Sequence, residues 1–370
     1  MKHIVFLALT LTRGGAERVI ANLCNEALSN EYRVSIVTCM NKPVGYELKP
    51  GIEHICIEKT SDVHYKNLGE RFLKRRILLK KVLEECKPDV LLCFLPEPNF
   101  LALSLKKYFD FPMLISVRND PAREYKNPVY RALMRVLYPK ADGYIFQTKQ
   151  AMEYFSFSKH IMDRACVIPN PLGREFVDYK RVPEENREKY IVNVGKLTGQ
   201  KNQKLLIEAF SRIAGKFPDY QLHIYGEGDR REELEAFVQE LSLKDRVVMP
   251  GNVSGLSEKI EAAALFVLSS DYEGMPNALM EAMAMGIPCI STNCPCGGSD
   301  YLIRNSENGI LVPVDEAEEL AEAMEKLLAD RELADKLGSN AVGIVEKLNP
   351  DVIHEMWKEY IKQYIGELSK

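Results

Sequence analysis

Residues 269–283 read SSDYEGMPNALMEAM and contain the most informative turn of the chain. The apolar run at residues 265–268 ends there, Gly274 and Pro276 shape a turn, and a helical pattern begins at Asn277. A buried strand that passes through a short turn into a helix is half of a β–α–β unit. This stretch therefore predicts a parallel sheet covered by helices.

The same alternation of short apolar runs and helical patterns continues in both directions. Strands are expected at residues 3–9, 33–39, 90–94, 113–117, 143–147 and 165–168, and again at 190–194, 221–225, 247–249, 265–268, 287–291 and 309–312. Helices are expected between them, for example at residues 16–29, 202–216, 231–241, 277–285 and 315–329. Two such series predict an α/β protein with two doubly wound, Rossmann-like domains.

A polar, proline-bearing stretch at residues 178–189 separates the two series. We expect a first domain at residues 1–177 and a second domain at residues 178–350. The C-terminal segment 351–370, with a helix at 351–368, is expected to pack back onto the first domain. Because open α/β sheets bind ligands at the carboxyl ends of their strands, two facing sheets predict a site in the cleft between them.

The composition is that of an ordinary globular protein, with 370 residues of which 46% are hydrophobic and 28% are charged. This argues against disorder and against a small disulfide framework. No apolar run reaches the roughly 18–20 residues of a membrane-spanning helix, and residues 1–11 predict a buried strand rather than a signal peptide. Several of the nine cysteines lie in apolar stretches, which favours a reducing, cytoplasmic compartment. Cys294-Pro295-Cys296 lacks the spacing of a zinc site, so no metal is expected there.

The net charge of −4 conceals an asymmetry between the halves. Residues 1–180 hold 28 Lys and Arg against 20 Asp and Glu, and the remainder holds 21 against 33. The basic half has no interleaved aromatic motif for bases, so nucleic acid is not an expected partner. The asymmetry suggests that the two halves face different partners.

Two loops near predicted helix starts could hold an anion. Gly14 and Gly15 lie between the first strand and its helix, where a backbone can approach a phosphate closely. Lys196 follows a strand and Lys201 precedes a helix, so their ammonium groups could flank a diphosphate. The alternative is an ordinary turn in the first case and two solvated lysines in the second.

Glu273 and Glu281 lie on either side of the turn and could accept hydrogen bonds from two pairs of sugar hydroxyls. The alternative is two unrelated surface carboxylates. The apolar residues around Glu281 weaken that alternative, because an unpartnered carboxylate among them would be costly.

These residues carry a resemblance to a known family. Glu273-x7-Glu281, in the context EGMPNALMEAMAMGIP, resembles the signature of the retaining glycosyltransferases of family 4. The resemblance extends, in the family's order, to Cys294-Pro295-Cys296-Gly297-Gly298, residues 194–202, Tyr225-Gly226-Glu227-Gly228 and Gly14-Gly15-Ala16-Glu17. It implies a glycosyltransferase-B fold, in which two Rossmann-like domains face each other across a cleft. By this resemblance, the domain at residues 1–177 would bind the acceptor and the domain at residues 178–350 would bind the nucleotide-sugar.

The resemblance also implies roles for individual residues. Lys196 and Lys201 would bind the donor diphosphate, Glu273 would hold hydroxyls of the transferred sugar, and Glu281 would hold the ribose. Lys196, Lys201 and Glu273 are therefore the implied catalytic residues. The other implied donor-binding residues are Gly14, Gly15, Gly226, Met249, Gly274, Met275, Pro276 and Asn277.

The chain departs from the family at three places. Lys196 occupies a position where the family often has Arg, which keeps the charge but loses bidentate recognition. Many members have a histidine in the region of residues 116–121, where this chain has Arg118 and Asn119, which we expect on the acceptor side. Residues 297–300 read GGSD in place of the commoner GGPRE pattern.

The implied reaction is a retaining transfer of a hexose or N-acetylhexosamine from a nucleotide-sugar, by family habit a UDP-sugar. The expected acceptor is a saccharide, carried on a polyprenyl diphosphate, in surface polysaccharide or glycan synthesis. No Asp-x-Asp motif occurs in the chain, so we expect no metal and no other cofactor. A sugar-nucleotide epimerase of the same fold and a non-catalytic sugar-nucleotide-binding subunit remain as alternatives.

Residues 68–83 form the densest basic stretch and predict a helix. At about 100° per residue, Leu68, Phe72, Leu79 and Leu83 share the expected core face. Leu73 and Ile77 fall on the opposite side, and the flanking cations are Lys74, Lys80 and Lys81. We hypothesise that this face docks on anionic lipid at the inner face of the plasma membrane. The alternative is a solvated basic helix with two incidental apolar residues.

Overall fold

The computed structural model describes residues 1–12, 14–60 and 63–366. The chain divides into two compact units, of which the first holds Met1–Pro171 with the chain from Pro350 onward, and the second holds Leu172–Asn349. The sequence placed the boundary after residue 177. The prediction of two doubly wound α/β domains is confirmed.

The described residues of the first unit form a seven-stranded parallel sheet in the order β3-β2-β1-β4-β5-β6-β7. Its strands are β1 (His3–Ala8), β2 (Arg33–Thr38), β3 (Glu53–Cys56), β4 (Val90–Phe94), β5 (Met113–Val117), β6 (Gly143–Phe146) and β7 (Ala165–Val167). The central strands are buried along their whole length, as expected for a parallel sheet with helices on both faces.

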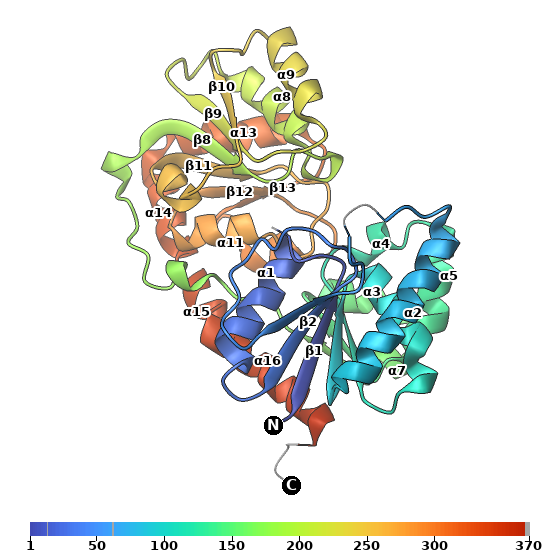
Figure 1. Ribbon diagram of the computed structural model, residues 1–370. Coiled ribbons are helices and arrows are strands. Elements are labelled where there is room, and N and C mark those ends of the chain that lie inside the picture. The colour runs from blue at the N-terminus through green and yellow to red at the C-terminus, as the bar shows by residue number, and fades with distance from the viewer. Residues whose placement is uncertain (13, 61–62, 367–370) are drawn as a thin grey trace. The chain divides into compact units, whose positions relative to one another are not determined.

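Helices cover both faces of this sheet, because right-handed crossovers that run toward opposite edges place their helices on opposite faces. One face carries α1 (Gly15–Asn22), a π-helical turn (Leu23–Leu28) and α16 (Pro350–Ile365). The other carries α2 (Leu68–Cys86), α3 (Pro96–Leu105), α5 (Pro128–Leu137) and α7 (Lys159–Met162), as Figure 1 shows. The unit also contains the short helices α4 (Pro121–Glu124) and α6 (Lys149–Glu153).

The C-terminal helix α16 is fastened to the first sheet by aromatic side chains. Trp357 is fully buried and stacks on Phe94 of β4, with ring centroids 5.9 Å apart. The Tyr360 hydroxyl accepts a hydrogen bond from the Tyr144 amide at 2.8 Å and donates one to the Arg164 carbonyl at 2.7 Å. These contacts support the expectation that the C-terminal helix packs on the first domain.

The described residues of the second unit form a six-stranded parallel sheet in the order β10-β9-β8-β11-β12-β13. Its strands are β8 (Glu188–Val194), β9 (Gln221–Tyr225), β10 (Val247–Gly251), β11 (Ala263–Leu268), β12 (Cys289–Thr292) and β13 (Ile310–Val312). One face carries α8 (Gln203–Ile213), α9 (Arg231–Glu240) and α13 (Ala317–Ala329). The remaining helices are α10 (Leu256–Ile260), α11 (Asn277–Ala284), α12 (Gly298–Leu302), α14 (Arg331–Ala341) and α15 (Ile344–Lys347).

Short 3₁₀ turns join several of these elements. They lie at Lys106–Tyr108, Tyr138–Lys140, Arg174–Phe176, Glu184–Asn186 and Gly199–Lys201. None of the described helices is both long enough and apolar enough to cross a bilayer.

Each strand predicted from the sequence is present, with ends shifted by at most two residues. The structure adds β3, a half-exposed edge strand whose sequence EHIC has no apolar run to signal it. The helix predicted at residues 16–29 is divided into α1 and the π-helical turn. The last predicted helix ends at Ile365, and residues 367–370 of the predicted segment lie outside the described part of the chain.

Candidate active site

Three loops of the second unit bring the predicted donor-binding residues to one edge of its sheet. Lys196 and Lys201 lie in the loop between β8 and α8, Gly226 follows β9, and Glu273 lies between β11 and α11. Because the strands are parallel, these loops all leave the carboxyl edge, where open α/β sheets bind ligands.

Lys201 and Glu273 form an ion pair, which sequence reasoning did not predict. The Glu273 carboxylate is only 6% exposed. Its Oε1 accepts hydrogen bonds from the Lys201 ammonium and, at 2.7 Å, from Ser270 Oγ. Gln200 Nε2 donates to the other oxygen at 3.4 Å. Both carboxylate oxygens are therefore engaged, and the carboxylate is held in a fixed position.

Lys196, by contrast, is exposed, and its ammonium group has no ion pair or hydrogen bond among the described residues. The loop that carries it is held by its backbone. The Gly195 amide donates to the Tyr225 carbonyl at 3.0 Å, and the Leu197 amide donates to the Glu227 carbonyl at 3.1 Å. Lys196 is thus a free cation on a fixed loop.

Gly226 is required where this loop meets the turn after β9. Its φ is +138°, and a Cβ at that position would overlap the Gly195 carbonyl. The same constraint operates at Gly298, where a Cβ would overlap the carbonyl of Gly274. Both glycines therefore allow one backbone to pack directly against another.

The turn before α11 is buried at Gly274, Met275 and Pro276. Asn277 begins the helix and Glu281 lies four residues further on, so both half-buried side chains project from the same helical face. Met249 lies on β10, where its carbonyl accepts a hydrogen bond from Arg231 Nη2 at 3.1 Å. Arg231 also pairs with Glu227, at 2.8 Å, beside the Gly226 turn.

Buried polar groups fix the end of β11 beneath the turn. Thr292 Oγ1 and Cys294 Sγ donate to the Ser270 carbonyl at 2.6 and 3.2 Å. Burial raises the pKa of Cys294 to about 12, so this thiol remains protonated and can donate. Within the described residues, no group of three or more His, Cys, Asp or Glu side chains has the geometry to hold a metal ion.

Sequence reasoning missed the residues that position the predicted ones. Ser270 and Gln200 hold Glu273, and Asn202 Nδ2 donates to Asp271 Oδ1 at 2.7 Å. Asn202 has a left-handed backbone, with φ +43°, and caps α8. All of these residues lie within the stretches quoted above, but only the fold reveals that the stretches touch.

The remaining predicted residues belong to the first unit. Gly14 caps α1, and its carbonyl accepts a hydrogen bond from the Tyr46 hydroxyl at 2.9 Å, while Gly15 is exposed. Asn119 Oδ1 accepts a hydrogen bond from the Asp120 amide at 2.9 Å, just after β5.

Arg118 is buried, with 7% of its surface exposed. Its Nε donates to Ser116 Oγ at 2.7 Å, its Nη1 donates to the Ile168 carbonyl at 3.1 Å, and the guanidinium lies 4.9 Å from the Trp357 ring. Burial lowers its pKa to about 9. The bonds observed for Arg118 are thus to protein groups, and its acceptor role remains a prediction.

Comparison with known proteins identifies the family. The model described as Glycosyltransferase Family 4 matches residues 13–175, and the model described as Glycosyl transferases group 1 matches residues 177–342. The protein belongs to the family 4 glycosyltransferases. The resemblance carried by Glu273-x7-Glu281 is thereby confirmed, and the two Rossmann-like domains of this glycosyltransferase are those of the glycosyltransferase-B fold.

Named relatives match most or nearly all of this glycosyltransferase. It is 30% identical over 98% of its length, and 99% of the relative, to the GalNAc-alpha-(1->4)-GalNAc-alpha-(1->3)-diNAcBac-PP-undecaprenol alpha-1,4-N-acetyl-D-galactosaminyltransferase of Campylobacter jejuni. It is 26% identical to the lipopolysaccharide 1,6-galactosyltransferase of Escherichia coli, over 80% of this chain and 81% of that one.

Solved structures share the fold at lower identity. Sucrose-phosphate synthase from Thermosynechococcus elongatus superposes with a TM-score of 0.84 at 21% identity, over the whole of both chains. Anabaena HepE in complex with UDP superposes with a TM-score of 0.79 at 18% identity, over 98% of this chain and 100% of that one.

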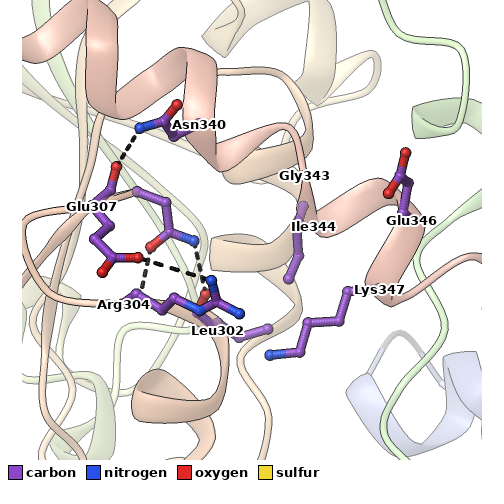
Figure 2. Close-up of a pocket in the computed structure, with 9 residues that line it drawn as sticks. Leu302, Arg304, Glu307, Asn340, Gly343, Ile344, Glu346 and Lys347 are labelled. Atoms are coloured by element: carbon purple, nitrogen blue, oxygen red, sulfur yellow. Dashed lines mark hydrogen bonds and ion pairs between the residues drawn. The ribbon is translucent and has the colours of Figure 1, made fainter.

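A hollow of about 720 Å³ lies at the opposite edge of the second sheet of the glycosyltransferase (Figure 2). Its lining includes Arg304 and Glu307, which precede β13, and Lys347 at the end of α15. Its charged residues are of both signs, and Arg304 is 81% exposed. Because it lies at the amino ends of the strands, we assign it no part in the chemistry at the carboxyl edge.

Proposed function

We propose that this glycosyltransferase moves a hexose or N-acetylhexosamine from a UDP-sugar to a saccharide carried on a polyprenyl diphosphate, with retention and without a metal ion. The proposed donor binding rests on one observation: the elements that follow β8 and β11 place four polar residues at the carboxyl edge of the second sheet, namely Lys196, Lys201, Glu273 and Glu281. The relative from C. jejuni is named for an undecaprenol-linked saccharide, and HepE is a fold neighbour bound to UDP; these names support the acceptor and donor classes.

The reaction needs stabilisation of its leaving group. As the glycosidic bond of the donor breaks, negative charge accumulates on the nucleoside diphosphate. Lys196 and Lys201 supply positive charge, and the first amides of α11 supply oriented donors, where that charge develops. Metal-dependent transferases commonly use an ion held by Asp-x-Asp for this purpose, and this sequence has no such motif.

Glu273 suits hydroxyl binding better than nucleophilic attack. Pairing with a cation reduces the nucleophilicity of a carboxylate, whereas a second lone pair on Oε2 can still accept a hydrogen bond from a hydroxyl. Here both oxygens accept hydrogen bonds, and one is paired with Lys201. These contacts support a front-face path, in which the leaving diphosphate removes the proton of the acceptor hydroxyl.

Lys196→Ala provides the direct test of charge stabilisation. Lys196 is exposed and unpaired among the described residues, so its removal should leave the melting temperature unchanged while turnover falls on the order of 10²–10³-fold. The matched control is Lys244→Ala, an exposed lysine that precedes β10 at the opposite edge of the same sheet. Near-wild-type turnover of Lys196→Ala, or of a folded Lys201→Ala enzyme, would contradict the mechanism.

Product analysis with the donor alone separates transfer from the two alternatives. An epimerase would convert the nucleotide-sugar without an acceptor, and a binding subunit would bind it without turnover. The relatives reported above are named transferases, so we expect the sugar to appear on the acceptor. A donor screen by thermal shift identifies the nucleotide and the sugar, because a ligand stabilises the fold that binds it.

We also propose that α2 contributes to docking on an anionic membrane. Leu73 and Ile77 are 55% and 60% exposed, so both side chains are accessible to a membrane surface. The lysines each lie near a glutamate one turn away. These pairs are Lys74–Glu70 at 2.8 Å, Lys80–Glu84 at 2.6 Å and Lys81–Glu85 at 3.9 Å. Their net attraction to lipid is therefore smaller than the lysine count suggests, and co-sedimentation of the wild type and a Leu73/Ile77 variant with anionic vesicles tests it.

A further inference from the structure

An apolar groove of about 260 Å³ opens between helices of the first unit. Its apolar lining comes from α2, α3 and α5, which lie on the same face of the sheet (Figure 1). The apolar residues that line it are Leu68, Phe72, Phe100, Val129, Tyr130 and Leu133. The sequence predicted Leu68 to be buried, and this was wrong: it is 67% exposed at the mouth of the groove. Two large apolar side chains, Leu68 and Val129, are thus exposed to water beside this apolar groove.

The groove continues along α5 as an exposed apolar stripe. Val129, Ala132, Leu133 and Val136 follow the spacing of one helical face, and Val129 and Val136 are 63% and 64% exposed. The buried face of the same helix carries Met134 and Leu137. A helix on the surface of a globular protein normally has one apolar face, which packs on the core. A second, exposed apolar face therefore indicates a binding site for an apolar ligand or surface.

The charge around this stripe is positive. The helix α5 contains Arg131 and Arg135 and no carboxylate, and Lys126 lies two residues before its first residue. None of these three cations has an ion pair among the described residues, and Arg135 lies 5.5 Å from the ring of Phe157, which is 49% exposed. The arginine at the other wall, Arg71, is instead neutralised by Glu97 at 3.2 Å. The cations available to an anionic head group are therefore those of α5 and the loop before it.

The position of the groove connects it to the acceptor side. It is lined by the first turns of α2, α3 and α5, and α3 and α5 follow β4 and β5 in the chain. Helices that follow parallel strands begin at the carboxyl edge of the sheet, so the groove opens at the edge where such sheets bind ligands. A hydrocarbon chain in the groove would thus leave its polar end at that edge.

We propose that this groove binds the first isoprenoid units of the lipid-linked acceptor, with Lys126, in the loop before α5, near its phosphates. This inference rests on the proposed polyprenyl-linked acceptor and adds the site that holds its lipid. The groove is smaller than the about 300–1,000 Å³ of a site for a whole small molecule. It therefore holds the part of the chain next to the phosphate, and the remainder stays in the bilayer.

Binding of farnesyl phosphate, a short soluble isoprenoid phosphate, tests the site. The variants Leu68→Gln and Val129→Asn remove apolar groove contacts from exposed positions, so both should fold. Each should weaken farnesyl phosphate binding about tenfold or more. The matched control is Val352→Asn, which changes a 54% exposed valine on α16 and should bind as the wild type does. Equal affinity of wild type and both groove variants, or no saturable binding by the wild type, would overturn the proposal.

A second measurement separates an isoprenoid site from other occupants. Vesicles of phosphatidylglycerol are compared with and without undecaprenyl phosphate, and the isoprenoid lipid should strengthen binding of the wild type but not of the groove variants. Vesicle binding that is lost in the groove variants but is not strengthened by undecaprenyl phosphate would overturn the proposal in favour of a phospholipid surface. A wild-type dimer that both variants dissociate would overturn it in favour of an interface between copies. The thermal shift caused by UDP-sugars should be the same in both variants as in the wild type. This measurement therefore tests the proposed donor separately from the proposed isoprenoid site.

Discussion

Replacing Lys201 by alanine should destabilise the second unit as well as impair catalysis. The change leaves the 6%-exposed Glu273 carboxylate without its cation. Removing one partner of a fully buried ion pair costs about 3–5 kcal/mol. Here the Lys201 side chain keeps 21% exposure, and Ser270 and Gln200 still donate to the carboxylate. We therefore expect a loss of about 2–3 kcal/mol in the free energy of unfolding.

The companion variant Glu273→Gln should cost less, about 1 kcal/mol, because its amide keeps hydrogen bonds and the freed Lys201 can reach water. The double variant should then be more stable than Lys201→Ala alone. A coupling energy of about 1–2 kcal/mol between the two positions is expected from their contact. A comparison of turnover between Lys201→Ala/Glu273→Gln and Glu273→Gln then measures the contribution of Lys201, because both proteins lack the Glu273 carboxylate.

Chemical denaturation followed by circular dichroism measures these differences for the four proteins at one pH. The single tryptophan, Trp357, lies in the first unit, so its fluorescence reports that unit separately. The Lys201→Ala shift should appear in the dichroism transition and be smaller in the fluorescence transition. An unchanged midpoint for Lys201→Ala, or a double variant that loses the sum of the two single losses, would refute the ion-pair reasoning.

Three further changes have defined outcomes. Gly298→Ala should lower the free energy of unfolding by about 1–3 kcal/mol and reduce turnover, because the new Cβ overlaps the Gly274 carbonyl. The control is Gly215→Ala, whose Cβ meets no atom within 4 Å and should change neither quantity. Burial raises the pKa of Glu124 from 4.5 to about 8, so the folded state holds a proton that the unfolded state releases between these pH values. The stability of the wild type should therefore fall as pH rises from about 4.5 to about 8. Denaturation at pH 5 and pH 8 should show a smaller fall for Glu124→Gln. Arg75→Met should cost about 3–5 kcal/mol, measured by tryptophan fluorescence, because it leaves two acidic partners without their shared cation.

Each of these has an outcome that contradicts it. Equal stability and turnover of the two glycine variants would show that the turn can shift away. A Glu124→Gln protein with the full pH dependence of the wild type would exclude Glu124 as its source. For Arg75, the control is Arg33→Met, which breaks an exposed pair with Glu53 and should cost about 0–1 kcal/mol; similar losses in both would refute the role of burial.

The sheets were predictable because their strands are continuous apolar runs, as fully buried parallel strands must be. β3 escaped prediction because an edge strand that is half exposed does not need such a run. The groove was not predicted either, because helical periodicity placed Leu68 on the core face. In the structure Leu68 lies in the first turn of α2 and is 67% exposed.

At the proposed donor site, residue spacing and the family resemblance selected Lys196, Lys201, Glu273 and Glu281, but did not show how they interact. Lys201 and Glu273 are 72 residues apart, and only the adjacency of β8 and β11 brings their loops together. The sequence therefore could not reveal that two residues expected to bind the donor bind each other. It also could not reveal Ser270 and Gln200 as their supports, because a serine and a glutamine in loops have no distinctive pattern.

The Lys201–Glu273 pair has a consequence for the catalytic cycle. The Glu273 carboxylate pairs with the ammonium group that a donor phosphate would contact, so of the two lysines only Lys196 has an uncompensated charge among the described residues. We expect the diphosphate to compete with Glu273 for Lys201, and the pair to re-form when the nucleotide departs. Such an internal competitor weakens the hold on the spent nucleotide, and release of product limits the turnover of many enzymes. The pair would thereby favour fast recycling of the enzyme over tight retention of its ligand.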